Sequence, residues 1–233
     1  MRNDEDRSPA PLYWIILPGV VGVMTFYYLT RADTIGVLTG RGWTPMTGSP
    51  VPAWAHFTAA ALLLGALPLA IACIATRTSP RRLGLGLGRW REGLLWLAIG
   101  IPLAIIAGRI AAANPLMRAV YPLFPADLDG AGAFAGYAAL QLVYYAAWET
   151  LFRGVLLFGL EDRLGDHAAN LVQTGLSVTA HFGRALPETL SALPAGLVFG
   201  AVALRTRSIW YVTVIHWTVG VSMDWFILHG TWG

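Results

Sequence analysis

Long apolar runs recur along the chain and limit the folds that it can adopt. Hydrophobic residues make up 56% of the sequence and charged residues only 12%, a composition far from that of soluble domains. A run of about 20 apolar residues is long enough to cross a bilayer as a helix, and in lipid only a helix or a closed barrel pairs all backbone polar groups. We therefore predict an all-α, polytopic membrane bundle of about seven transmembrane helices. It would form a single membrane domain over residues 1–233.

The predicted helices differ in length. Five are long enough to span the membrane, and Pro102 predicts a kink in the third. Two shorter ones follow the fourth, and they are either tilted spans or a re-entrant pair. The seven predicted helices cover approximately residues 12–30, 51–75, 92–112, 133–160, 168–182, 190–204 and 208–228.

Arginine is distributed unevenly between the loops. Segment 76–91 contains five arginines, and short Arg-rich loops stay in the cytoplasm. With seven spans, the cytoplasmic segments hold ten arginines and the outer loops four. We therefore predict a multi-pass protein of the cell membrane with a cytoplasmic N-terminus. The net charge of +3 is too small and too dispersed to indicate nucleic-acid binding, so the lipid bilayer is the partner that composition predicts.

One predicted helix carries opposite charges at bilayer depth. Glu149 and Arg153 lie one turn apart within 133–160, and Tyr145 shares their face of the helix. An ionisable residue inside a membrane segment is costly, so it marks a functional site by default. The alternative interpretation is a structural ion pair, which is the usual way in which such charges are tolerated.

Two histidines are predicted to lie near the depth of Glu149. At about 1.5 Å rise per residue, Glu149 lies roughly 17 Å, His181 roughly 20 Å and His216 roughly 12 Å from the cytoplasmic ends of their helices. Three polar groups at similar depth on three helices can form one site. His216, Gly220 and Asp224 also share one face of the last helix. Gly220 would leave space beside His216 for a backbone or a substrate, and Asp224 would orient His216 or act as a ligand.

Such a set of side chains is suited to activating water. A desolvated glutamate can serve as general base, here Glu149, with Arg153 orienting it. The imidazoles of His181 and His216 can stabilise an oxyanion, donate a proton to a leaving amine or, with Glu149, hold a divalent metal such as zinc. No HExxH motif is present, so the cofactor stays unknown. The single cysteine, Cys73, lies in an apolar run and is not expected to act as nucleophile. No role is assigned to three further histidines near predicted helix ends, His56, His167 and His229.

Three motifs in the C-terminal half resemble those of the CPBP family (CAAX-protease and bacteriocin-processing, or Abi) of intramembrane endopeptidases. The stretch Trp148-Glu149-Thr150-Leu151-Phe152-Arg153-Gly154 is similar to the family's Glu-Glu-x-x-x-Arg motif from the second Glu onward. Ser177-Val178-Thr179-Ala180-His181 resembles Phe-x-x-x-His, and His216-Trp217-Thr218-Val219-Gly220 resembles His-x-x-x-Asn. The resemblance covers approximately residues 136–228, which are the predicted catalytic core.

The chain departs from the family pattern at Trp148, Ser177 and Gly220. The family's first Glu is usually assigned the water-activating role, so either Glu149 has taken it over or this is a non-proteolytic relative. The Trp-Glu-x-x-Phe-Arg-Gly form resembles a variant subgroup that has a Pro-Glu after the second motif and an Asp two turns after the last His. Pro187-Glu188 and Asp224 are similar to these features.

The resemblance implies an intramembrane endopeptidase that hydrolyses a membrane-associated protein or peptide with glutamate- and histidine-activated water. Four residues are the expected catalytic set, Glu149, Arg153, His181 and His216. Three more are expected as additional polar groups around them, Tyr145, Glu188 and Asp224. Two alternatives stay open: sortase-like processing of C-terminal membrane anchors, by hydrolysis or transpeptidation, and a non-catalytic scaffold or immunity protein. A proton or solute transporter is a weaker alternative, and the substrate and the oligomeric state are not predicted.

Overall fold

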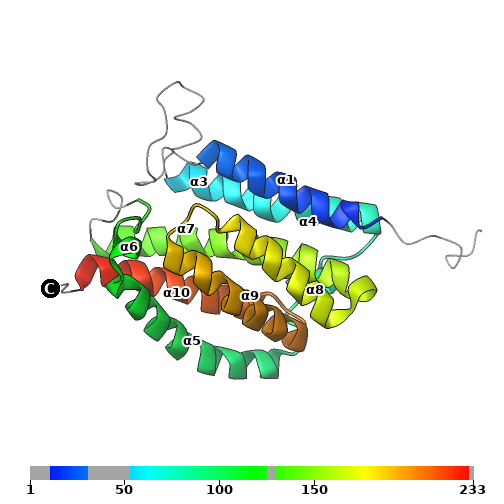
Figure 1. Cartoon of the computed structure of the whole chain (residues 1–233). Coiled ribbons are helices and arrows are strands. Elements are labelled where there is room, and N and C mark those ends of the chain that lie inside the picture. The colour runs from blue at the N-terminus through cyan, green and yellow to red at the C-terminus, as the bar shows by residue number, and fades with distance from the viewer. Residues whose placement is uncertain (1–10, 31–52, 125–127, 129, 231–233) are drawn as a thin grey trace, which may run out of the picture.

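The chain folds into an α-helical bundle (Figure 1). The computed structural model describes residues 11–30, 53–124, 128 and 130–230. Helices make up 86% of these residues, and none of them lies in a strand. In chain order the elements are α1 (Tyr13–Thr30), α3 (Ala53–Ala60), η2 (Ala61–Ala66), α4 (Leu67–Thr76), η3 (Arg81–Leu85), α5 (Trp90–Ala113), α6 (Pro115–Arg118), α7 (Ala131–Glu149), η5 (Thr150–Phe158), α8 (Gly159–Ala180), α9 (Leu186–Thr206) and α10 (Trp210–His229).

Five helical segments of the described chain are long and apolar enough to cross a membrane. They are Tyr13–Thr30, Ala53–Thr76, Arg81–Ala113, Leu186–Thr206 and Trp210–His229. The prediction of an all-α, multi-pass membrane bundle is therefore confirmed. The five segments are not the five predicted as long, because 133–160 is not among them and Leu186–Thr206, predicted as a shorter helix at 190–204, is. The start of the second predicted helix, at residues 51 and 52, lies outside the described residues, as do Arg2 and Arg7 at the N-terminus.

Several of these elements join into longer helices. Residues Ala53–Thr76 run through a widened π-helical segment, η2, without leaving the helical conformation. Helix α7 likewise continues through the π-helical segment η5 into α8. This helix ends only at Gly165, whose φ of +73° suits glycine. The turn between the fourth and fifth predicted helices, 133–160 and 168–182, is therefore made at this one glycine. Pro102 lies inside α5, which continues past it and curves in Figure 1.

Helix α7 occupies a central place in the bundle. It contacts α3 and η2 on one side and α10 on another, while α5 packs along α10 (Figure 1). All nine residues of η5 are buried, and Leu151, Val155 and Leu157 have no exposed surface. The segment that carries Glu149 and Arg153 therefore lies in the interior of the bundle.

The two shorter predicted helices correspond to the second part of α8 and to α9, which pack side by side. Asn170 Nδ2 donates to the carbonyl of Leu197 at 3.0 Å, and Gln173 Nε2 donates to the carbonyl of Gly196 at 3.1 Å. A Cβ atom on Gly200 would lie 1.8 Å from Asn170 Oδ1, so the glycine permits this close approach. Two polar residues of α8 thus bind the backbone of α9.

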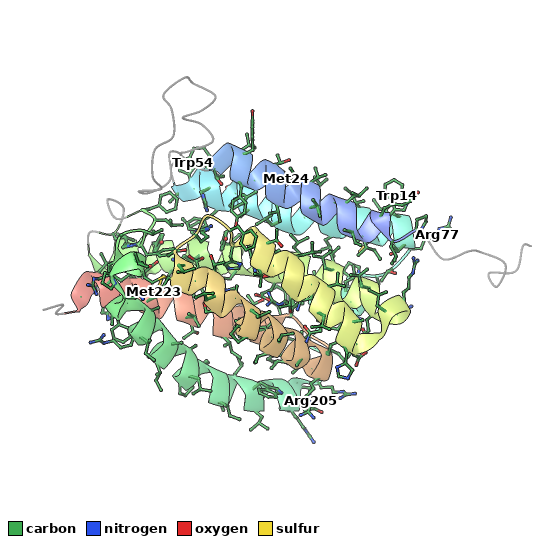
Figure 2. All side chains as sticks on the ribbon, in the orientation of Figure 1. Trp14, Met24, Trp54, Arg77, Arg205 and Met223 are labelled. Carbon is green, nitrogen blue, oxygen red and sulfur yellow. The ribbon has the colours of Figure 1, made fainter. Side chains whose placement is uncertain are left out.

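The Arg-rich connections meet at one end of the bundle. Arg89 N donates to the carbonyl of Thr206 at 2.7 Å, and Arg82 pairs with Asp162 at 3.5 Å. Figure 2 shows Arg77 and Arg205 at this end and Trp54 and Met223 toward the other. The described arginines of this end are Arg77, Arg81, Arg82, Arg89, Arg91, Arg163, Arg205 and Arg207.

Candidate active site

Helices α7 and α10 face each other along a row of polar side chains. On α7 the row repeats every four residues, which is one face of a helix. His216 Nδ1 and Glu149 Oε1 are 2.7 Å apart at one end of the row. At the other end Asp224 Oδ2 accepts hydrogen bonds from Gln141 Nε2 at 2.6 Å and from Tyr137 OH at 3.0 Å. The two polar faces that the spacing predicted are therefore packed against each other.

Glu149 is fully buried and is bound from two sides. Its Oε1 accepts from Arg153 Nη1 at 3.2 Å and from His216 Nδ1 at 2.7 Å. The side chains of Glu149 and Arg153 are 0% and 2% exposed. Because a carboxylate oxygen only accepts, Nδ1 of His216 carries the proton, and Nε2 is left for another partner. Glu149 therefore determines the tautomer and the orientation of His216.

The middle of the row differs from the prediction. A Cβ atom on Gly220 would lie 2.1 Å from the hydroxyl of Tyr145, and the Tyr145 ring packs 4.5 Å from the ring of His216. The prediction that Gly220 leaves space for a backbone or a substrate was wrong, because Tyr145 fills that space. The prediction that Asp224 orients His216 was also wrong, because the antiparallel register of the helices places Asp224 opposite Gln141.

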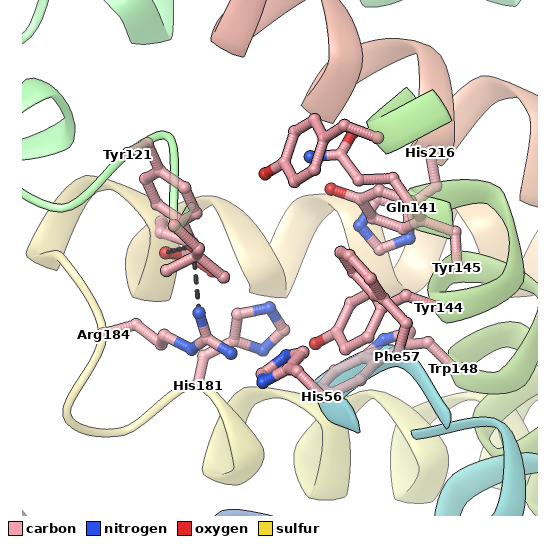
Figure 3. Close-up of a pocket in the computed structure, with 13 residues that line it drawn as sticks. His56, Phe57, Tyr121, Gln141, Tyr144, Tyr145, Trp148, His181, Arg184 and His216 are labelled. Carbon is pink, nitrogen blue, oxygen red and sulfur yellow. Dashed lines mark hydrogen bonds between the residues drawn. The ribbon is translucent and has the colours of Figure 1, made fainter. Parts of the chain in front are cut away.

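A cavity of about 60 Å³ lies beside this row and is large enough for a few water molecules. Six of its thirteen lining residues are Phe, Tyr or Trp, and three more are histidines. Figure 3 shows Arg184 and Tyr121 on one side of the cavity and Tyr145 and Gln141 on the other. The titratable or charged side chains that line it, besides tyrosines, are His56, His181, Arg184, Glu188 and His216. Glu149 and Asp224 do not line it.

His181 reaches the cavity from the end of α8. The helix ends at Ala180, and His181 caps it. Its Nδ1 lies 2.7 Å from the carbonyl oxygen of Ser177, which can only accept, so Nδ1 carries the proton and Nε2 is left for another partner. The ring also contacts Trp148 edge-on, with centroids 5.2 Å apart. The structure thus brings His181 and His216 to one cavity, while Glu149 takes part through His216.

Sequence reasoning missed His56, which lines the same cavity. Only 4% of its surface is exposed, and the rings of Phe26, Phe57 and Phe124 surround it at 5.0–5.5 Å. Neither ring nitrogen has a hydrogen-bond partner among the described residues. No motif marks His56, since its place depends on how the Ala53–Thr76 helix packs against α7.

Tyr121 and Arg184 were missed as well, and they hold Glu188. Arg184 Nη1 donates to Tyr121 OH at 3.1 Å, and this hydroxyl donates to Glu188 Oε2 at 2.7 Å. Burial, and then the neighbouring Glu188 carboxylate, raise the pKa of Tyr121 well above its usual value. The phenol therefore keeps its proton and donates to Glu188. Glu188, expected as an additional polar group, lies on the cavity, whereas Asp224 lies at the far end of the row and does not line the cavity.

The residues predicted to hold a zinc ion do not fit that role. Across the part of the chain that the structure describes, no three His, Cys, Asp or Glu side chains gather so as to hold a metal ion. Glu149 Oε1 already binds Arg153 and the protonated Nδ1 of His216, and Glu149 does not line the cavity that His181 lines.

Comparison with known proteins supports the resemblance. Residues 131–222 match the family described as "Type II CAAX prenyl endopeptidase Rce1-like". The matched segment contains the Glu149–His216 pair, His181 and Glu188, and it covers less than half of the chain. No curated protein and no solved structure matches. The match supports the CPBP family and a CAAX-type intramembrane protease; the Trp-Glu subgroup stays a prediction.

Proposed function

We propose that the protein is an intramembrane endopeptidase that hydrolyses peptide bonds of membrane-associated protein substrates. One observation carries the proposal: His181 and His216, from two helices, line one small cavity, and each has its Nδ1 proton bound to an acceptor. Each imidazole therefore has Nε2 left for the reacting groups. The match of residues 131–222 to a protease family supports the same conclusion.

His216, His181 and Arg153 have different proposed roles. His216 acts in its imidazolium form, whose charge the Glu149 carboxylate balances, and donates from Nε2 to the developing oxyanion. His181, held by the carbonyl of Ser177, is directed at the attacking water. Arg153 compensates the charge of Glu149 inside the membrane.

The role of Glu149 in this proposal differs from the one that its motif predicts. Its carboxylate is fully buried and does not line the cavity, so it has no direct access to water there. A general base has to lie within hydrogen-bond reach of the proton that it removes. Glu149 is accordingly proposed as a positioning residue that acts through His216.

The test is cleavage by the purified full chain in proteoliposomes. Two probes are used: a farnesylated peptide ending in a CAAX sequence, and a reporter protein with a single C-terminal membrane anchor. We expect the wild type to cut one of them, with one water added across the bond by mass spectrometry. His181→Ala and His216→Ala should each lower kcat by about 10²–10⁴. Cleavage by both variants at the wild-type rate would overturn the proposal.

The position of the cavity favours a narrower second candidate, processing of membrane anchors from the non-cytoplasmic side. Tyr121 follows α6, Arg184 lies between α8 and α9, and Glu188 lies in the first turn of α9. In Figures 1 and 2, α6 lies toward the end of the bundle opposite Arg77 and Arg205. If the Arg-rich end is cytoplasmic, as the distribution of arginine predicts, the cavity lies toward the exported part of a substrate. Cleavage of the anchored reporter but not of the farnesylated peptide would support this candidate.

Hydrolysis is expected to be the outcome of such processing. Cys73 is the only cysteine of the chain, and it does not line the cavity, so the site offers no thiol for a thioester intermediate. Mass spectrometry of the new C-terminus separates the two reactions, because a free carboxylate indicates hydrolysis and an added group indicates transpeptidation.

A further inference from the structure

The cavity has one carboxylate in its wall, and it comes from α9. Among the described residues that line the cavity, Glu188 is the only Asp or Glu. Building on the proposed endopeptidase function, we infer that Glu188 is the general base that takes a proton from the attacking water. The residue lies in the first turn of α9, directly after Pro187.

The other two carboxylates near the site are buried and do not line the cavity. Glu149 Oε1 binds Arg153 and His216, and Asp224 Oδ2 binds Gln141 and Tyr137. The second oxygens, Glu149 Oε2 and Asp224 Oδ1, are buried and have no hydrogen-bond partner among the described residues. Both carboxylates have 0% exposed surface, and neither lines the cavity. Glu188 is partly exposed. Of the three, only Glu188 can meet a water molecule in the cavity.

Glu188 is oriented by bonds that leave one of its oxygens available. Oε2 accepts from Tyr121 OH at 2.7 Å. The other oxygen, Oε1, makes no hydrogen bond to the residues that the structure describes. Tyr121 is in turn held by Arg184 Nη1 at 3.1 Å. A carboxylate that is fixed through one oxygen and open at the other has the arrangement that a general base needs.

The segment that carries Glu188 is also hydrogen-bonded to His181. The hydroxyl of the next residue, Thr189, donates to the backbone carbonyl of His181 at 2.9 Å. The two side chains line the same cavity and interact electrostatically. Trp148, which precedes Glu149 in the chain, turns an indole toward this cavity and packs against the ring of His181. The carboxylate beside His181 is therefore supplied by α9 and not by α7.

The reaction balances without any further reactant. Glu188 removes a proton from water while the water oxygen bonds to the carbonyl carbon of the scissile peptide, and the carbonyl π electrons move to its oxygen. When the carbon–nitrogen bond breaks, the leaving nitrogen takes up the proton from Glu188. The products are a carboxylic acid and an amine, and Glu188 is again a carboxylate.

The test compares Glu188→Gln with the wild type on whichever probe the wild type cleaves. Glutamine keeps an oxygen that accepts from Tyr121 OH but is not a base, so the network around it is retained. We expect kcat to fall at least about 100-fold, with KM and the melting temperature unchanged. Glu188→Asp should recover part of the loss. The matched control is Asp162→Asn, a carboxylate at the opposite end whose ion pair with Arg82 is largely exposed.

Two results would overturn the inference, and they differ in what else they affect. In the first, Glu188→Gln keeps kcat within about threefold of the wild type, while His216→Ala loses activity by the factor expected of acid–base catalysis. The protein is then a protease whose base is another group. If His216→Ala cleaves as fast as the wild type, the proposed function fails and the inference fails with it. A purely structural role for Glu188 would show as a lower melting temperature with kcat unchanged.

Discussion

Two clusters of this molecule each join an arginine to a glutamate, and they differ in what holds them. The helix cluster consists of Arg153, Glu149 and His216, on two packed helices, with the ion pair spaced i, i+4. The loop cluster consists of Arg184, Tyr121 and Glu188, three residues that lie at or near helix ends.

The clusters differ in their access to the cavity, and that difference separates their roles. Glu149 of the helix cluster has no exposed surface and does not line the cavity. All three residues of the loop cluster line it. Charges buried between helices can position a neighbouring group, but a group that reacts with water needs access to it. Four substitutions test this division.

Removing Glu149 should have the largest effect. Glu149→Ala leaves the guanidinium of Arg153 buried without its counter-ion and His216 without an acceptor. Breaking a buried pair in this way costs about 3–5 kcal/mol, so both the melting temperature and kcat should fall. Thermal unfolding in detergent measures the first, and the reporter assay the second. A melting temperature equal to that of Asp162→Asn would show that the helix cluster does not stabilise the bundle.

The second substitution tests the far end of the polar row. Gln141→Leu removes the shorter of the two hydrogen bonds to Asp224. An acceptor in the interior that loses a donor costs about 1–3 kcal/mol. The melting temperature should fall by less than in Glu149→Ala, and thermal unfolding of the two variants side by side checks the order. A Gln141→Leu variant as stable as the wild type would contradict the assigned bond.

The third substitution tests the close approach of α7 to α10. Gly220→Ala places a Cβ atom 2.1 Å from Tyr145 OH, and overpacking of this kind costs about 1–3 kcal/mol. It should also lower kcat, because Tyr145 packs against His216. Adding Tyr145→Phe should restore part of the stability. The matched control is Gly136→Ala on α7, where a Cβ atom meets nothing within 4 Å; equal effects of the two alanines would contradict the packing argument.

The smallest effect on stability is expected in the loop cluster. Tyr121→Phe removes the hydroxyl that donates to Glu188, a partly buried bond worth about 1 kcal/mol. The melting temperature should hardly change, whereas kcat should fall about tenfold, which corresponds to about 1.4 kcal/mol in the barrier. Unfolding and steady-state kinetics on the same preparation separate the two quantities. A loss of stability without a loss of kcat would assign Tyr121 a structural role only.

The helix cluster was predictable because its pattern is local. Glu149 and Arg153 are four residues apart inside an apolar run, and the helical period alone places them on one face. The similar estimated depths of Glu149 and His216 predicted that they could meet, and the 2.7 Å contact is consistent with that estimate. Both observations depend only on helix geometry and on the thickness of a bilayer.

The loop cluster could not be predicted in the same way. Tyr121 is 67 residues from Glu188 and 63 residues from Arg184 in the chain, and no helical or strand period relates such positions. His56 was missed for a similar reason, since its aromatic surroundings come from three separate segments. The Pro187-Glu188 pair was noticed only through a resemblance, without any indication that its carboxylate lies on the cavity.

The amino-acid sequence by itself determined that the chain is a multi-pass helical membrane protein, because apolar runs of this length have few other stable arrangements in lipid. It also determined which faces of two helices are polar, because a helix repeats every 3.6 residues. Only the tertiary structure decided which glutamate meets the cavity. That choice depends on the antiparallel register of α7 and α10, which buries Glu149 behind His216, and on the connections that bring Glu188 beside His181.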